Sequence, residues 1–112
     1  MSARIIIERK FKKPINQEML TIINEIRLKA IWQRGYISEE TVVNSDDDKD
    51  ILVISSWSDV NNWKRWHETK TWKEFEKSQA PHLEGPIEIR IFIPAADYEK
   101  KFLVEVKDRT PV

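Results

Sequence analysis

The stretch ILVISSWSDVNNWKRWH, from Ile51 to His67, carries the strongest indication of the fold. It joins an uninterrupted apolar run to three tryptophans, and with Trp72 close behind, four of the chain's five tryptophans fall within 16 residues. A buried tryptophan removes roughly 150–250 Å² from water, a gross stabilisation of about 4–6 kcal/mol before conformational entropy is subtracted. These residues therefore mark the interior of the domain, and they could also form the walls of a ligand pocket.

Hydrophobic periodicity on both sides of this stretch predicts the remaining elements. Residues 3–11 alternate, with Ile5, Ile7 and Arg9 on one face, which is typical of a strand. Apolar residues then recur at helical spacing, and Leu28 and Ile31 widen the stripe that the helix is expected to bury. The predicted order is a strand over 3–11, a helix between Pro14 and Gly35, and strands over 36–43 and 50–57. Next come a short helix that Ser58 or Asp59 caps and that runs to Trp66, a helix that begins at Thr69 or Lys70 and runs to about Gln79, and a strand over 87–93.

This order is that of a ferredoxin-like, split βαβ fold, so we predict an α+β domain with an antiparallel sheet. At 112 residues the chain is expected to form one domain over 1–112, with its core over 3–94. The extension over 95–112 contains the apolar run 102–106, which indicates a peripheral strand or a tail that orders against a partner subunit.

The continuous apolar run 51–54 indicates a central strand that is covered on both faces. In a ferredoxin-like fold the helices cover only one face of the sheet, whichever register the strands adopt. The other face would then expose apolar residues, either Ile6 and Leu52 with Ile54 or the opposite set Ile5, Ile7 and Ile51, and exposed apolar patches mark interfaces. We therefore expect a homodimer formed by sheet packing, with two-fold symmetry.

Composition favours some classes of protein over others. Nineteen basic and nineteen acidic residues cancel, so no global field attracts nucleic acid or an anionic membrane. No cysteine is present, which excludes disulfides and thiolate metal sites and agrees with a cytoplasmic location. No apolar segment approaches the roughly 20 residues that span a bilayer, and the N-terminal apolar run is too short for a signal peptide.

Two charged segments have alternative interpretations. The acidic run Asp46–Asp48, with Asp50, could hold Ca²⁺ or Mg²⁺, but it lacks a glycine and a distal glutamate in calcium-loop register, so a solvated hairpin tip is preferred and no metal is predicted. Lysines and arginines over 64–77 alternate with glutamates and aromatic residues, which could bind RNA, but they better suit an exposed helix face with paired charges.

Three segments together carry a family resemblance: the strand ending in Ser56–Trp57, the tryptophan-rich helices through Phe75, and the run from Pro81 to Arg90 with its Gly85–Pro86 pair. This region, over 50–94, resembles the antibiotic biosynthesis monooxygenase (ABM) domain. The resemblance implies a dimeric α+β barrel. It also implies several functions, since the family includes cofactor-independent monooxygenases of aromatic polyketide or quinol substrates, haem-degrading enzymes and signalling proteins.

The haem-degrading branch of the family can be compared residue by residue. Trp66 matches the tryptophan of that branch, whereas Ile7 falls near the position of its asparagine and Glu76 near that of its histidine. Since two of three positions differ, haem binding or degradation is the least favoured alternative.

The leading hypothesis is a cofactor-independent monooxygenase acting on a small aromatic or quinol-like molecule, and the alternative is a non-enzymatic dimeric module for small-ligand binding or stress signalling. Oxidation of an electron-rich substrate by O₂ needs an apolar, water-excluding site and one base or hydrogen-bond donor.

We expect His67 and Asn62 to act in catalysis, because histidine titrates near neutral pH and an amide can orient a phenolic oxygen. Arg90 is a further polar candidate, and the expected substrate-binding residues are Trp63, Trp66, Trp72, Phe75, Tyr36 and Arg34. Each has a structural alternative: core packing for the aromatic residues, a rim position for His67, and helix-end or cross-strand contacts for the arginines.

Overall fold

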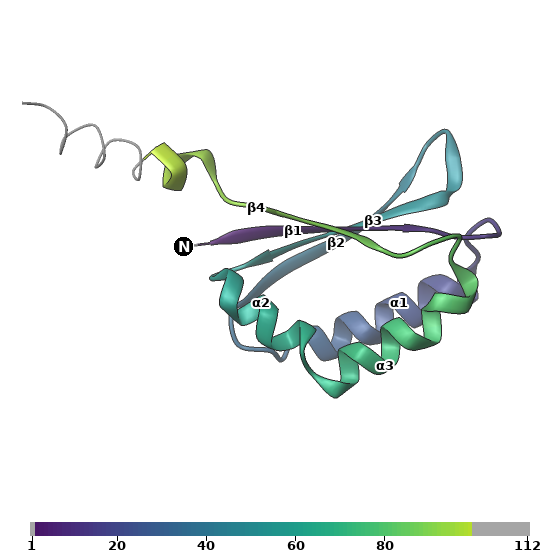
Figure 1. Ribbon diagram of the computed structural model, residues 1–112, viewed down its shortest axis with the longest axis horizontal. Coiled ribbons are helices and arrows are strands. Elements are labelled where there is room, and N and C mark those ends of the chain that lie inside the picture. Colours follow the sequence, from purple (N-terminus) through teal and green to yellow (C-terminus); the bar gives the residue numbers. More distant parts are fainter. Residues whose placement is uncertain (1, 100–112) are drawn as a thin grey trace, which may run out of the picture.

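The computed structural model describes residues 2–99 and has two layers, a four-stranded antiparallel sheet and a set of helices on one of its faces (Figure 1). The elements are, in chain order, β1 (Ala3–Lys10), α1 (Gln17–Ala30), β2 (Tyr36–Asn44), β3 (Asp47–Trp57), α2 (Val60–His67), α3 (Lys70–Gln79), the 3₁₀ turn η1 (Ala80–His82) and β4 (Glu88–Phe92). The strand order is β2-β3-β1-β4. The α+β, ferredoxin-like prediction is therefore confirmed, with β3 central as expected.

Helix starts follow the capping residues seen in the sequence. Asp59 caps α2 by accepting from the Asn61 amide at 2.8 Å, and Thr69 caps α3 by accepting from the Trp72 amide at 3.2 Å. The first helix begins later than expected, because Asn16 is its cap and accepts from the Met19 amide at 2.9 Å. Pro14 therefore precedes α1 and is not part of its first turn.

The end of α1 also differs from the prediction. The helix stops at Ala30, and Gly35 lies beyond it with a φ of +86°, where the chain turns into β2 and the Asn62 side chain packs against it. Leu28 and Ile31 are 60% and 41% exposed, so the buried stripe of α1 is narrower than expected. Only Ile23 and Ala30 of this helix are fully buried.

Two further boundaries are corrected. The polar loop between β2 and β3 is shorter than predicted, because β3 already begins at Asp47 and pairs with Asn44. After β4, residues 95–99 are helical, where a strand was expected, and the apolar run 102–106 lies outside the described residues.

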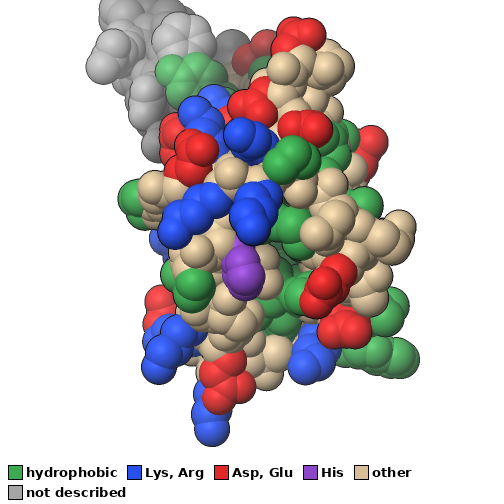
Figure 2. Space-filling view, turned by 90° about the vertical axis from the view of Figure 1, so that its right-hand side faces the viewer, with side chains coloured by type: hydrophobic (Ala, Val, Ile, Leu, Met, Phe, Trp, Pro, Cys, Tyr) green, Lys and Arg blue, Asp and Glu red, His purple; other side chains and the backbone are tan. Residues whose placement is uncertain are grey.

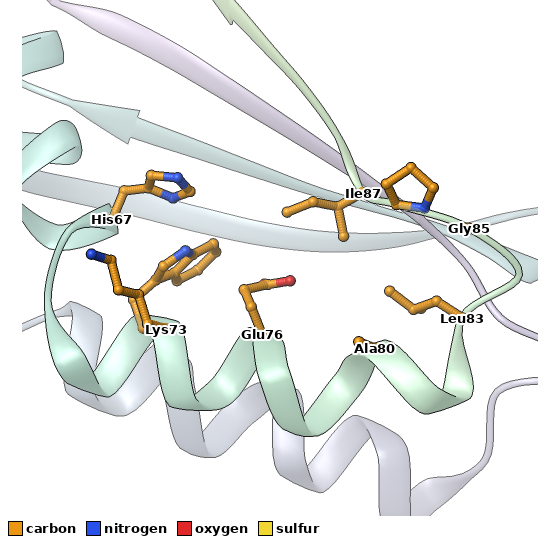
Figure 3. Close-up of a pocket in the computed structure, with 9 residues that line it drawn as sticks. His67, Lys73, Glu76, Ala80, Leu83, Gly85 and Ile87 are labelled. Atoms are coloured by element: carbon orange, nitrogen blue, oxygen red, sulfur yellow. The ribbon is translucent and has the colours of Figure 1, made fainter.

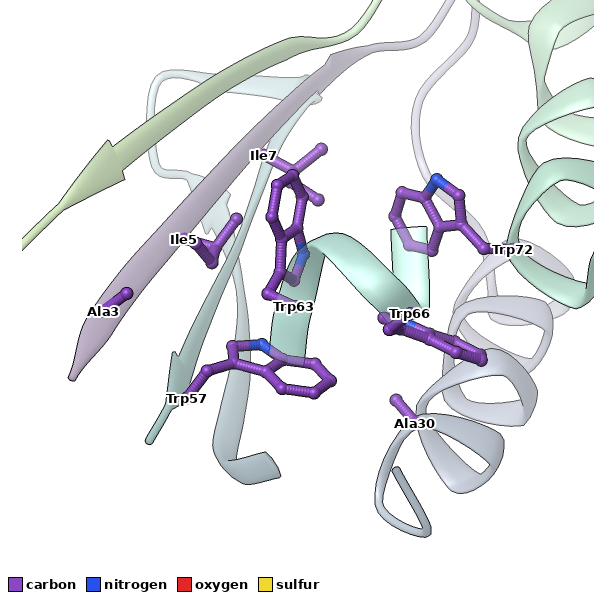
Figure 4. Close-up of a cluster of buried hydrophobic side chains, with 8 residues drawn as sticks. All are labelled: Ala3, Ile5, Ile7, Ala30, Trp57, Trp63, Trp66 and Trp72. Carbon is purple, nitrogen blue, oxygen red and sulfur yellow. The ribbon is translucent and has the colours of Figure 1, made fainter. Parts of the chain in front are cut away.

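The core lies between the sheet and the helices. Trp57 from β3, Trp63 and Trp66 from α2 and Trp72 from α3 are each 1–6% exposed, and they pack on Ile5 and other residues of β1 (Figure 4). The Trp57 indole donates to Ser55 Oγ at 3.1 Å, so its polar atom is satisfied in the interior. The prediction that the tryptophans mark the interior is confirmed.

Candidate functional site

An open pocket of about 470 Å³ lies between α3 and the loop that leads into β4. His67 stands at one end of it, Leu83 and Gly85 lie at the other, and Glu76 rises from α3 between them (Figure 3). The lining residues are His67, Trp72, Lys73, Glu76, Ala80, Leu83, Gly85, Pro86 and Ile87.

His67 is the last residue of α2 and is held between two tryptophans. Its ring stacks on Trp63, with centroids 4.8 Å apart and an interplanar angle of 23°, and it lies 5.3 Å from the ring of Trp72. Its Nδ1 is buried and has no hydrogen-bond partner among the described residues. The imidazole is therefore oriented by ring packing at the edge of the pocket.

Glu76 is held by a buried arginine. Arg9 is 2% exposed on the helix-covered face of β1 and forms an ion pair with the Glu76 carboxylate. The Arg9 guanidinium carbon also lies 5.8 Å from the ring centroid of Trp72 and 5.4 Å from that of Phe75, within cation–π distance. One arginine thus joins the sheet to α3 and fixes the carboxylate that lines the pocket.

A second carboxylate, that of Glu39, also interacts with the charge of Arg9. Burial raises the pKa of Glu39 on β2, while the positive charges of Arg27 and Arg9 lower it in part. Burial likewise raises the pKa of Tyr36, with a smaller contribution from the charge of Glu39. The interior between sheet and helices therefore contains a charged network as well as an apolar core. The Arg9 Nε atom lacks a partner among residues 2–99.

The structure brings two of the expected site residues, His67 and Trp72, to the pocket. Trp63 supports His67 from behind, Trp66 packs edge-on against Trp72 at 6.1 Å within the core, and Phe75 contacts Arg9. None of these three lines the pocket.

The remaining candidates lie elsewhere. Asn62 donates to Ser58 Oγ at 3.1 Å beside Gly35, and Tyr36 packs edge-on against Trp57 at 5.6 Å. Arg34 is exposed in the connection from α1 to β2, and the exposed Arg90 lies over the ring of Phe92.

Sequence reasoning missed three features of the pocket. The role of Arg9 had a signal, since an arginine falls on the apolar face of the first strand. Glu76 entered the prediction only as a mismatch to a histidine, and nothing in the sequence linked it to Arg9. The contribution of 83–87 had no local signal, because that loop is held at the pocket by long-range pairing, of Phe11 with Leu83 and of β1 with β4.

Metal binding receives no support from the described part of the chain, where no group of three or more histidine, cysteine, aspartate or glutamate side chains is placed to hold an ion. The acidic hairpin tip instead makes local hydrogen bonds, including Asn44 Nδ2 to Asp50 Oδ2 at 3.1 Å. None of the helices over 2–99 is both long and apolar enough to span a membrane.

Comparison with solved structures places this architecture among known folds. A conserved protein from Methanosarcina mazei aligns with a TM-score of 0.74 at 15% identity, over 82% of this chain and 91% of that one. SnoaB from Streptomyces nogalater, a cofactor-independent oxygenase, aligns with a TM-score of 0.73 at 12% identity, over 83% and 92%. A protein from Shewanella oneidensis aligns with a TM-score of 0.70 at 10% identity, over 81% and 88%. At these identities the likeness is one of fold.

Comparison of sequences gives the family. Among curated proteins, none matches this sequence. The family model described as antibiotic biosynthesis monooxygenase matches residues 3–78, which include every element from β1 to most of α3. The chain therefore belongs to the antibiotic biosynthesis monooxygenase family.

Proposed function

We propose that this protein is a cofactor-independent monooxygenase that oxidises a small aromatic or quinol-like molecule in the pocket beside His67. The observation that carries the proposal is the imidazole of His67, stacked on Trp63 at the edge of a pocket lined by Trp72, Leu83 and Ile87. A fold shared with a cofactor-independent oxygenase supports the same chemistry.

The reaction requires little beyond a base and an apolar site. His67 accepts the proton of a phenolic hydroxyl, and the resulting phenolate donates electrons to O₂ far more readily than the neutral phenol. Dioxygen adds to an activated ring carbon that carries hydrogen, forming a carbon–oxygen bond and a hydroperoxide. Loss of water from that hydroperoxide leaves one oxygen atom as a carbonyl, so substrate plus O₂ gives quinone plus water, and the substrate supplies all the electrons.

The pocket supports each requirement of this scheme. Trp72 and Ile87 offer apolar surface for a ring, and a volume of about 470 Å³ accommodates one or two fused rings. Glu76 lines the pocket with a carboxylate, and its pair with Arg9 keeps that carboxylate in place. Asn62 remains a candidate for catalysis only through a rearrangement, since its amide is bonded to Ser58.

The assembly is also a proposal. The face of the sheet away from the helices carries Ile6, Leu52 and Ile54 at intermediate exposure, which supports a homodimer formed by packing two such faces. Along this face Arg4 lies toward one end of β1, Arg90 lies opposite Ile6, and Glu8 pairs with Glu88 toward the other end. A two-fold axis that reverses strand direction would place opposite charges near one another.

Catalysis is tested by following O₂ consumption with a panel of hydroquinones, naphthols and anthrones. The wild-type protein is expected to exceed the buffer rate, and His67→Ala to lower kcat about 10²–10⁴-fold, with partial recovery on adding imidazole. Lys64→Gln, on the exposed face of the same helix, serves as the matched control and is expected to retain full activity.

Other outcomes assign the pocket differently. Quenching of tryptophan fluorescence by these compounds without O₂ consumption would reject the oxygenase and favour a non-enzymatic ligand-binding module. A shifted Soret band on titration with haem would instead favour a haem-related role.

A further inference from the structure

A second pocket, of about 310 Å³, lies at the end of the molecule where the chain leaves β1 and where α3 passes into η1 (Figure 1). The Lys12 amide donates to the His82 carbonyl at 2.9 Å, and Phe11 pairs with Leu83, so the two segments that frame this pocket are bonded together. Its lining residues are Lys12, Lys13, Asn16, Glu18, Met19, Ile22, Gln79, Pro81 and His82. The pocket shares no lining residue with the one beside His67.

Gln79 is the unusual residue of this pocket. It ends α3 and is 4% exposed, yet its amide forms no hydrogen bond with any residue in the part of the chain that the structure describes. The residue is buried as a whole, but its amide atoms are not enclosed and border the pocket, where a ligand oxygen can accept from the N–H.

Charge around the pocket favours an anion. Lys12 and Lys13 are exposed at its rim, and α1 begins beside them with Asn16 as its cap, so the positive end of the helix dipole faces the same space. On the end of the molecule seen in Figure 2, basic side chains gather beside a histidine. Glu18, in the first turn of α1, is the opposing charge, which leaves the two lysines in excess.

The apolar walls of the pocket indicate that the bound anion also has an apolar part. Met19 and Ile22 of α1 and Pro81 of η1 give it an apolar side. A phosphate ion would leave this side facing water, whereas an organic acid would cover it with carbon.

We propose that this pocket binds a small organic carboxylate, with its carboxylate between Lys12 and Lys13, one oxygen accepting from the Gln79 amide, and its carbon body against Met19, Ile22 and Pro81. This site is separate from the proposed oxidation site and does not depend on it. Because the bonded segments 11–13 and 81–83 already frame the pocket, binding requires little reordering of the backbone.

The test is a titration of the ¹⁵N-labelled protein with benzoate, inorganic phosphate and neutral benzyl alcohol at constant ionic strength. Benzoate is expected to shift the Gln79 side-chain amide signal saturably, with phosphate and benzyl alcohol binding more weakly. The indole N–H of Trp72 reports on the other pocket and separates binding there from binding here.

Variants then check the assignment of charge. Lys12→Gln and Lys13→Gln are each expected to raise the benzoate dissociation constant about five-fold, while Glu18→Gln should lower it about two-fold, since each changes one charge at a partly exposed site. Gln79→Met should also weaken binding. Lys77→Gln removes the same charge from the exposed side of α3 and is the matched control, expected to leave the constant unchanged.

The proposal is overturned if benzoate shifts the Trp72 signal but not the Gln79 signal, or if it shifts neither signal. It is also overturned if Lys77→Gln weakens binding as much as Lys12→Gln. Tighter binding of phosphate than of benzoate would overturn the choice of a carboxylate. The lysine variants lie on the surface, so they keep the test decisive if Gln79→Met fails to fold.

Discussion

The two faces of the sheet differ in how far their apolar side chains are buried, and β1 contributes residues to both faces. Its residues Ile5 and Ile7, on the helix-covered face, are 0% and 3% exposed. On the opposite face Ile6 remains at intermediate exposure beside Leu52 and Ile54 of β3. The helices α1–α3 therefore cover one face of this strand and leave the other face uncovered. Burial of an isoleucine in β1 is decided by the layer packed against it and not by the residue type.

Charge is also distributed differently on the two faces. The helix-covered face carries a buried arginine, Arg9, which is compensated by Glu76 and Glu39. The open face places its charges around an apolar centre, where solvent or a second subunit can reach them. A buried charge needs an internal partner, whereas an exposed one does not.

The largest expected effect is the difference in stability between truncating Ile5 and truncating its neighbour Ile6, which lie on opposite faces of β1. Ile5→Ala is expected to lower the free energy of unfolding by about 2–5 kcal/mol, because it leaves a cavity in the tryptophan cluster. Ile6→Ala should cost less than about 1 kcal/mol in the dilute monomer. Urea denaturation at several protein concentrations measures both, and equal losses at all concentrations would remove the distinction between the faces.

Breaking the buried ion pair should also lower the stability of the fold. Glu76→Ala is expected to destabilise the fold by about 2 kcal/mol, since it leaves Arg9 buried with one partner fewer, and the partial exposure of Glu76 reduces the loss. The double variant Arg9→Met with Glu76→Leu should recover most of this stability in thermal unfolding.

A surface pair provides the control for this prediction. Lys73 and Glu68 approach to 3.1 Å while both remain largely exposed, so Glu68→Ala should change the free energy of unfolding by no more than about 0.5 kcal/mol. Similar losses at Glu68 and Glu76 would show that Arg9 does not depend on its carboxylate.

The open face can be tested by placing a charge at its centre. If two such faces pack together, Ile54→Asp should raise the dimer dissociation constant about a hundredfold, because the carboxylate would be buried without a partner. Analytical ultracentrifugation measures this change. Asn61→Asp adds the same charge to the exposed side of α2 and should leave the constant unchanged, and a wild-type protein that sediments as a monomer at micromolar concentration would contradict the proposed dimer.

The smallest effect concerns pH. A hydrogen bond shared with the Asp50 carboxyl raises the pKa of Glu8 above its ordinary value of 4.5, with further contributions from burial and from the charges of Asp50 and Glu88. The folded state therefore holds this proton more tightly than the unfolded state, so the stabilisation it gives is present below pH 4.5 and is lost as pH rises through the folded pKa.

Glu8→Gln should accordingly raise Tm by about 2 °C at neutral pH and should lose this advantage as the pH falls below 4.5. Glu40 lies on β2, on the same face of the sheet as Glu8. Glu40→Gln is the control, and its effect on Tm should not show this pH dependence. A benefit of Glu8→Gln that persists unchanged at low pH would exclude the shared proton as its cause.

The sequence predicted the fold because its signals are local. Alternation in β1, the capping residues Asp59 and Thr69, and the continuous run before Trp57 each depend on neighbours a few residues away. The errors arise where residue type alone was followed. Leu28 matches the helical stripe in type yet is 60% exposed, and Ile31 lies just past the end of α1 and is 41% exposed.

The candidate site was less accessible to the same reasoning. His67 and Trp72 were expected at a pocket because they share a short helical region with the other tryptophans. The pair of Arg9 with Glu76 joins residues 67 positions apart, and the loop 83–87 is held at the pocket by pairing with the distant first strand and the residues after it. No periodicity encodes such contacts.

By itself, then, the sequence determined the order of elements, the identity of the core tryptophans and the apolar character of both sheet faces, since these follow from residue type and short-range spacing. Only the tertiary structure decided which of those tryptophans borders a pocket, where the imidazole of His67 points, and which carboxylates compensate Arg9. Those features depend on the packing of three helices against one sheet, where a shift in a single helix end changes which atoms meet.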